Sequence, residues 1–251
     1  MRTGNPALSE KAFTVLDPSA EAMTINGTVN KTAILLALCV LAGVFTWNMV
    51  YQSEFAFGEA GVNPIAYPLM IGGAITGFIL ALIVIFKKKT APYIAPLYAI
   101  AEGLFLGGIS AVYEMQFQGI VLQAVTLTFG TLFALLLAYR SGLIKVTENF
   151  KLGVVAATGA IALVYLASWI LSMFNIGAMG FIHDSGMMGI GFSLFVVVIA
   201  SLNLVLDFDF IENAVEAGAP KYLEWYGAFG LMVTLVWLYL EMLRLLSKLR
   251  R

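Results

Sequence analysis

Long apolar stretches, separated by short polar connections, fill nearly the whole chain. Seven of them approach or exceed the about 20 residues that are needed to cross the hydrocarbon core of a bilayer. They cover residues 32–51, 64–86, 93–113, 120–139, 152–174, 189–206 and 225–246. The pattern therefore predicts an all-α integral membrane protein with seven transmembrane helices in contact with the lipid bilayer.

The sixth stretch continues as a helical pattern beyond its last uncharged residue. Asp207 and Asp209 follow directly, and the pattern ends at the Gly-Ala-Pro run of residues 218–220, which is a typical stop signal. A helix over residues 189–217 is about 43 Å long, whereas the hydrocarbon is about 30 Å thick. We expect this helix to project from the bilayer and to place both aspartates at or just inside one interface.

The composition leaves little room for a soluble domain. Of the 251 residues, 61% are hydrophobic and 12% are charged, whereas soluble domains carry about 25% charged residues. We expect the polar residues 1–30 to form an N-terminal arm in the cytoplasm and residues 31–251 to form the membrane domain. The net charge of −1 provides no basic surface for nucleic acid, whose binding depends on neutralising phosphates.

The distribution of Lys and Arg predicts the orientation, because cytoplasmic loops are enriched in both. With the N-terminus in the cytoplasm, ten of the fourteen basic residues lie inside: Arg2, Lys11, Lys31, Lys87, Lys88, Lys89, Arg140, Lys145, Lys151 and Lys221. The other four, Arg244, Lys248, Arg250 and Arg251, lie outside if the seventh segment crosses fully. A re-entrant seventh segment would return them to the cytoplasm, but the length of the run favours a full crossing.

Small residues spaced four apart let helices approach closely in lipid. Gly73 and Gly77 have this spacing in the second span, and Gly103 and Gly107 have it in the third. We expect both pairs to mark helix contacts.

Ionisable side chains inside a membrane are costly and are therefore candidate functional groups. The chain offers Asp207, Asp209, Glu102 and Glu241. Asp207 is the leading candidate for a proton switch or a cation gate, because Asn203 lies one turn earlier on the same face and could hydrogen-bond to it. Asp209 points about 200° away on a regular helix. The alternative is that these acids form only the solvated end of a helix.

The other candidates also have two interpretations each. Glu102, near the middle of the third span, is either a proton or cation relay or a neutral, hydrogen-bonded acid packed between helices. Glu241 precedes Arg244 by three positions, which favours a helical ion pair. His183 and Asp184 are typical of an exposed loop, and one histidine without cysteine partners makes a poor metal site.

No catalytic motif is present. The single histidine excludes H-E-x-x-H, there is no G-x-x-x-x-G-K-S/T phosphate loop, and the predicted spans contain no lysine for a Schiff base. The sequence predicts no enzyme, no cofactor and no firm metal site. Any path for Ca²⁺ would involve Asp207 and Asp209.

The stretch L-V-L-D-F-D-F-I resembles the end of the sixth span in the Bax inhibitor-1/YccA family of multi-pass membrane proteins. There an apolar run precedes Asp and, four residues later, Ile, which Asp207 and Ile211 match. N-P-A-L from Asn5, A-E-G-L-F-L-G-G-I-S-A from Ala101 and Y-R-S-G-L-I-K-V-T-E-N-F from Tyr139 are similar to a bacterial branch. The resemblance covers essentially the whole chain and implies the plasma (inner) membrane of a bacterium.

The resemblance implies seven helices, the last of which is central and surrounded by the others. It also implies, for some members, a pH-sensitive calcium leak in which the aspartate ending span six pairs with another in span seven. Asp207 matches the first aspartate, but the second falls at Thr234, which is not acidic. Glu241 lies two turns further along the same face. A partner for Asp207 would then be Asp209, from a locally unwound segment, or Glu102.

Two functions of different classes follow. The first is a Bax inhibitor-like leak for cations, Ca²⁺ above all, in which ionised Asp207 holds a cytoplasmic gate through a basic or polar partner and protonation weakens the contact. The alternative is a regulatory scaffold that binds other membrane proteins such as a membrane protease, as the resemblance to YccA suggests, with the acidic surface from Glu212 to Glu224 as its docking face. A proton-coupled transporter is less favoured, because no pair of broken helices is evident.

Overall fold

The computed structural model of the chain describes residues 21–57, 66–174, 182 and 184–251. In this part of the chain the elements are α1 (Ile25–Phe57), α2 (Ala66–Phe86), the 3₁₀ turn η3 (Lys88–Thr90), α3 (Ala91–Gln116), α4 (Ile120–Arg140), α5 (Glu148–Met173), α6 (Met187–Glu216) and α7 (Leu223–Leu249). Seven helices of the described residues are long and apolar enough to cross a membrane. The predicted all-α, seven-helix fold is therefore confirmed.

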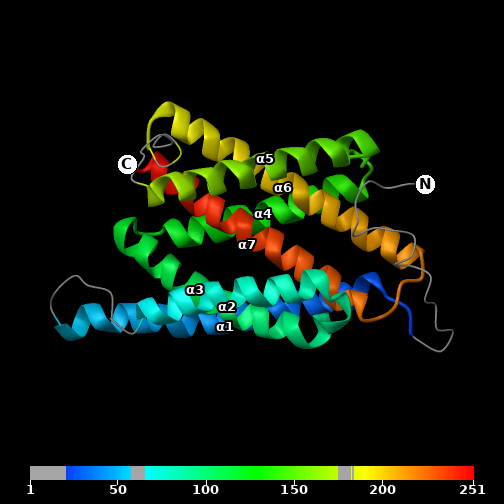
Figure 1. The fold of residues 1–251 in the computed structure, drawn as a ribbon, viewed down its shortest axis with the longest axis horizontal. Coiled ribbons are helices and arrows are strands. Elements are labelled where there is room, and N and C mark those ends of the chain that lie inside the picture. The colour runs from blue at the N-terminus through cyan, green and yellow to red at the C-terminus, as the bar shows by residue number, and fades with distance from the viewer. Residues whose placement is uncertain (1–20, 58–65, 175–181, 183) are drawn as a thin grey trace.

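The last helix lies at the centre of the bundle. Two groups of three helices, α1–α3 and α4–α6, flank α7 (Figure 1), which packs against α1, α3, α4 and α6. Its side chains Leu235, Leu238 and Leu243 are buried together with Leu204 of α6 in the largest apolar cluster. This core holds the two groups together, because neither group buries its inner face without α7.

Glycines let α3 approach its neighbours at the level of the backbone, as their spacing predicts. A Cβ on Gly107 would collide with the backbone of Gly43 in α1, and a Cβ on Gly103 would collide with the carbonyl of Cys39. On the other side of α3, a Cβ on Gly73 of α2 would lie 2.6 Å from the carbonyl oxygen of Ala101. The three helices α1–α3 therefore form one tightly packed unit.

The first helix begins earlier than predicted, so the last part of the predicted N-terminal arm is helical. The Thr24 hydroxyl accepts a hydrogen bond from the Gly27 N–H at 2.9 Å, as an N-cap residue does. Met23 is buried, and its N–H donates to the carbonyl of Ala219 at 2.7 Å. This cap and this pairing fix the start of α1 at Ile25, against the connection between α6 and α7.

The sixth helix ends where the sequence places its stop signal. After Glu216, Gly218 adopts φ 65°, a left-handed conformation that glycine reaches without strain. The N–H of Ala219 donates to the carbonyl of Ala214 at 3.0 Å, and that of Gly218 donates to Val215 at 3.0 Å, which is a Schellman motif. The helix is regular through Asp207 and Asp209, so the locally unwound segment considered from the sequence is not observed.

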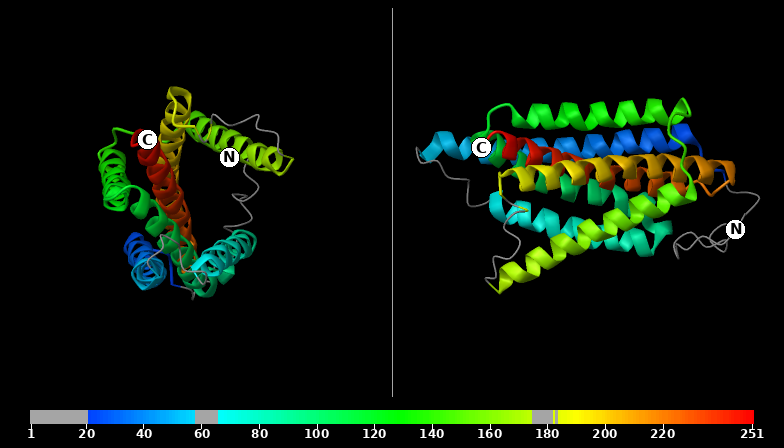
Figure 2. Two further views of the ribbon diagram at one scale, coloured as in Figure 1. Left: turned by 90° about the vertical axis from the view of Figure 1, so that its left-hand side faces the viewer. Right: turned by 90° about the horizontal axis from the view of Figure 1, so that it is seen from above.

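The seventh helix is continuous, and its two ends lie at opposite ends of the bundle (Figure 2). The Arg250 guanidinium donates to the carbonyl of Gln118 at 2.7 Å and to the side chain of Gln123 at 2.8 Å, where α3 connects to α4. Lys248 donates to the carbonyl of Gly189 at 2.9 Å, near the start of α6. The helix therefore crosses the bundle fully instead of re-entering, and its basic tail lies opposite the described N-terminal residues.

Candidate functional site

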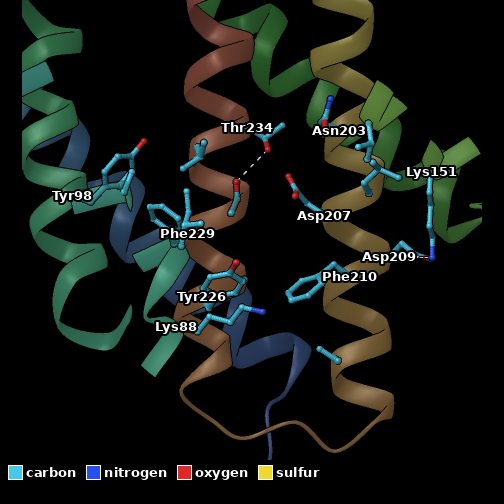
Figure 3. A pocket seen from close by; sticks show the side chains of 18 of the residues that line it. Lys88, Tyr98, Lys151, Asn203, Asp207, Asp209, Phe210, Tyr226, Phe229 and Thr234 are labelled. Atoms are coloured by element: carbon cyan, nitrogen blue, oxygen red, sulfur yellow. Dashed lines mark hydrogen bonds and ion pairs between the residues drawn. The ribbon is translucent and has the colours of Figure 1, made fainter. Parts of the chain in front are cut away.

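A cavity of about 1190 Å³ lies between the two groups of helices. Side chains of α2 and α3 line one side of it and those of α5 and α6 line the other. Helix α7 lies between α3 and α6 and forms the back wall (Figure 3). Its lining is mainly apolar. Among the polar side chains deep inside are Glu102, Asn203, Asp207 and Thr234. Toward the end of the bundle where α6 connects to α7, the charged side chains are Lys88, Glu148, Lys151 and Asp209.

Asp207 projects from α6 toward α7, where Thr234 lies beside it (Figure 3). Its Oδ2 atom is buried and has no hydrogen-bond partner. The Thr234 hydroxyl reaches the carbonyl of Gly230 at 3.2 Å and also lies within hydrogen-bonding reach of the Asp207 carboxyl group. Gly230 of α7 faces the carboxyl group from the other helix: a Cβ at this position would lie 3.9 Å from Oδ1 of Asp207. Because glycine has no side chain, α7 offers no side-chain partner there. Such a site accommodates a neutral carboxyl group, since an ionised one without a partner is costly to bury.

Asn203 does not bond to Asp207, so the prediction of that pair is wrong. The Asn203 amide donates to the Thr158 hydroxyl of α5 at 2.8 Å and to the carbonyl of Ile199 at 2.8 Å. Both amide hydrogens are therefore satisfied away from Asp207. The spacing along α6 permitted the predicted bond, but a hydroxyl on a neighbouring helix competes for the same donor.

Asp209 lies on a different side of α6 from Asp207, as the helical spacing predicts. Its Oδ2 atom is 2.9 Å from Nζ of Lys151 on α5, and the same Nζ is 3.5 Å from Glu148. This ion-pair cluster stands at the mouth of the cavity. Because Asp209 is engaged there on a regular helix, it is not the partner of Asp207.

Glu102 shares the cavity with Asp207, although the two residues are far apart in the sequence. The Glu102 side chain reaches from α3 toward α2, where its Oε2 atom lies 2.8 Å from the position of a Cβ on Gly77. The absence of a side chain at Gly77 thus leaves room for the carboxylate. The tertiary structure brings these two predicted acids into one cavity.

Glu241 belongs to a separate polar cluster nearer the C-terminal end of α7. Its Oε1 atom is 2.8 Å from the Arg244 guanidinium, which confirms the predicted ion pair. The Tyr165 hydroxyl of α5 also donates to Oε1 at 3.0 Å. Glu241 does not line the cavity, so the structure separates it from Asp207. His183 lies outside the described residues.

A family model described as Bax inhibitor 1 like matches residues 5–251. The chain belongs to this family. Comparisons with curated proteins and with solved structures gave no match. For a Bax inhibitor 1-like protein, the resemblance noted above implies an acid on the last helix opposite Asp207. In this chain the residue beside Asp207 is Thr234. Of the other acids that line the cavity, Asp209 and Glu148 are paired with Lys151, and Glu102 of α3 is the remaining one.

The sequence did not reveal the aromatic part of the cavity. Tyr98 of α3 packs edge-on against Phe229 of α7, with ring centroids 5.0 Å apart. Tyr226 of α7 lies 6.0 Å from Phe210 of α6, and Nζ of Lys88 lies 5.2 Å from the centroid of the Tyr226 ring. All five line the cavity. The only signal in the sequence is that Lys88 belongs to the triple lysine after the second span, which indicates the orientation but not a cavity.

Proposed function

We propose that this Bax inhibitor 1-like protein is a proton-sensitive leak for cations, Ca²⁺ among them, and that Asp207 is its switch. The observation that carries the proposal is the buried Oδ2 atom of Asp207, which has no hydrogen-bond partner in a cavity that also contains Glu102. Carboxylate oxygens are the ligands that Ca²⁺ prefers. Two acids in one membrane cavity are therefore suited to attract a cation when they are ionised.

In this proposal the described structure is the closed state. Beyond the cavity, toward the C-terminal end of α7, the side chains Leu235, Leu238 and Met242 are buried in the main core cluster. A hydrated cation cannot pass an apolar core of this density. Conduction therefore needs a shift of α7 relative to α6, and Asp207 lies at the interface between these two helices.

The sign of the pH response follows from the surroundings of Asp207. No salt bridge joins it to a basic side chain of the described residues; the other ionisable side chains that line the cavity are Glu102, Asp209, Glu148, Lys88, Lys151, Tyr98 and Tyr226. The closed state suits the neutral carboxyl group, whereas ionisation leaves a buried charge that a cation or an opening of the helices relieves. We expect the leak to rise with pH. This sign is the opposite of the one that the sequence predicts, in which ionised Asp207 holds the gate and protonation weakens the contact.

The mouth of the cavity, with Lys88, Lys151 and Asp209, lies at the same end as the described N-terminal residues. In the proposed orientation this end faces the cytoplasm, in agreement with the excess of Lys and Arg there. Asp207 would then respond to cytoplasmic pH. The proposed location is the inner membrane of a bacterium.

The test is Ca²⁺ flux into dye-loaded liposomes that contain the purified protein, from about pH 6 to about pH 8, a range that a buried carboxyl group can reach. The flux should rise with pH, and the Asp207→Asn variant should show a low flux at every pH. Glu212→Gln is the matched control, because Glu212 lies on the same helix and bonds to Tyr139 outside the cavity. A normal pH response in Asp207→Asn would reject the proposal.

The alternative, a regulatory scaffold for other membrane proteins, has less support. Glu224 is not accessible on its proposed docking face, because the Glu224 side chain is 1% exposed and forms an ion pair with Lys31. Glu224 also accepts hydrogen bonds from the N–H and the hydroxyl of Thr24, each at 2.9 Å. Glu224 thus anchors the start of α1. Co-purification of a membrane protein from mild detergent, together with no flux at any pH, would favour the scaffold.

A further inference from the structure

We propose that the same cavity binds hydrophobic organic cations, such as lipophilic ammonium or phosphonium ions. The positive centre would lie near Asp207 and Glu102. The apolar groups would lie against the aromatic wall, which is formed by Tyr98, Phe105, Phe210, Tyr226 and Phe229. The proposal depends on the cavity and not on ion conduction. A leak and a binding site of this kind can exist independently.

The first argument is the combination of acids and aromatic rings. Phe105 joins Tyr98, Phe210, Tyr226 and Phe229 in the lining. The faces of such rings attract cations, and the attraction is stronger when water is excluded. Lys88 already places its ammonium over the Tyr226 ring, so this wall holds a cation in the described structure.

The second argument is the distribution of charge between the inside and the mouth. At the mouth, Lys151 is paired with Asp209 and Glu148, so its charge is compensated. Deeper inside, Asp207 has a buried oxygen without a partner, and Glu102 is a second acid that lines the cavity away from the Lys151 cluster. When these two acids are ionised they repel an anion and attract a cation, whereas a neutral molecule gains no charge attraction from them. The inner cavity therefore favours a cation.

The third argument is size and access. A volume of about 1190 Å³ exceeds the range of about 300–1,000 Å³ that is typical of pockets for drug-sized molecules. The packing of α2 is chiefly on α3 and that of α5 is on α6, and the two helices stand apart on one side of the bundle (Figure 2). Phe78 of α2 and Val155 of α5 line the cavity and are also exposed. A ligand that partitions into the bilayer can enter between these helices.

The experiment measures equilibrium binding of tetraphenylphosphonium to the full chain in lipid nanodiscs, without any ion gradient. Tetraphenylborate is the matched probe, because it has nearly the same shape and the opposite charge. We expect saturable binding of the phosphonium and none of the borate. Empty nanodiscs correct for partition into lipid.

Variants then locate the site. The double variant Glu102→Gln with Asp207→Asn should bind the phosphonium at least about tenfold more weakly, and Phe105→Leu should also weaken binding. Glu212→Gln, outside the cavity, should bind normally. The thermal midpoint of each purified variant shows whether it is folded, and Phe105→Leu tests the site without touching either acid.

Equal binding of the two probes, or binding that neither the double variant nor Phe105→Leu weakens, would overturn the proposal. The outcome is separate from that of the leak, because the binding assay contains no flux. Saturable, acid-dependent binding in a protein without Ca²⁺ flux would support this site and reject the leak. Flux without such binding would reject this binding site and would not contradict the proposed leak.

Discussion

The hydroxyl of Thr234 on α7 lies between two acceptors, the carboxyl group of Asp207 on α6 and the carbonyl of Gly230, which it reaches at 3.2 Å (Figure 3). A hydroxyl can donate only one hydrogen bond. While Thr234 donates to α7, its oxygen can accept the proton of a neutral Asp207. When Asp207 ionises, the same hydroxyl must turn away from Gly230 in order to donate to the carboxylate. In the proposed leak, protonation of Asp207 is thereby coupled to a backbone contact of α7.

This relationship predicts the behaviour of Thr234→Val, which keeps the shape of the side chain and removes the hydroxyl. Because the ionised carboxylate loses its nearest donor, we expect the Ca²⁺ flux at about pH 8 to fall several-fold, which corresponds to about 1 kcal/mol for one hydrogen bond. The flux at about pH 6 should change little. Thr234→Ser, which retains the hydroxyl, is the control. Equal fluxes for Thr234→Val and the unmodified protein across this range would show that the hydroxyl takes no part.

A second prediction concerns the packing of α1 against α3. Gly107→Ala places a Cβ against the backbone of Gly43, which cannot yield as a flexible side chain can. We expect a loss of about 1–3 kcal/mol in stability, measured as a lower midpoint in thermal unfolding of the purified protein. Gly130→Ala in α4 is the matched control, because nothing lies within 4 Å of its new Cβ and alanine favours a helix. An unchanged midpoint for Gly107→Ala would contradict this packing.

A third prediction concerns the course of α7 through the membrane. In a Cys39→Ala background, Lys89→Cys and Lys145→Cys should react with a membrane-impermeant maleimide from one side. Arg251→Cys should react only from the other side, because α7 carries the tail across the bundle. These three positions are exposed. Labelling of Arg251→Cys from the same side as Lys89→Cys would contradict a full crossing and would show that the seventh segment is re-entrant.

The spacing of residues along a helix predicted one side-chain pair correctly and another incorrectly. Glu241 and Arg244 form the predicted ion pair at 2.8 Å, because residues three apart are neighbours on any regular helix. Asn203 has an equally favourable spacing from Asp207, but the Thr158 hydroxyl of α5 receives its hydrogen bond instead. Spacing predicts which side chains can meet. A neighbouring helix decides whether they do.

By itself, the sequence determined the seven helices, the end of α6 and the glycine-mediated contacts of α3, since these depend on local hydrophobicity, backbone conformation and side-chain size. Only the tertiary structure placed Glu102 of α3 in one cavity with Asp207 of α6 and Thr234 of α7 beside Asp207. It also lined that cavity with aromatic rings from four helices. Apolar runs of similar composition do not specify which faces of different helices come together, because that choice depends on how all seven pack around α7.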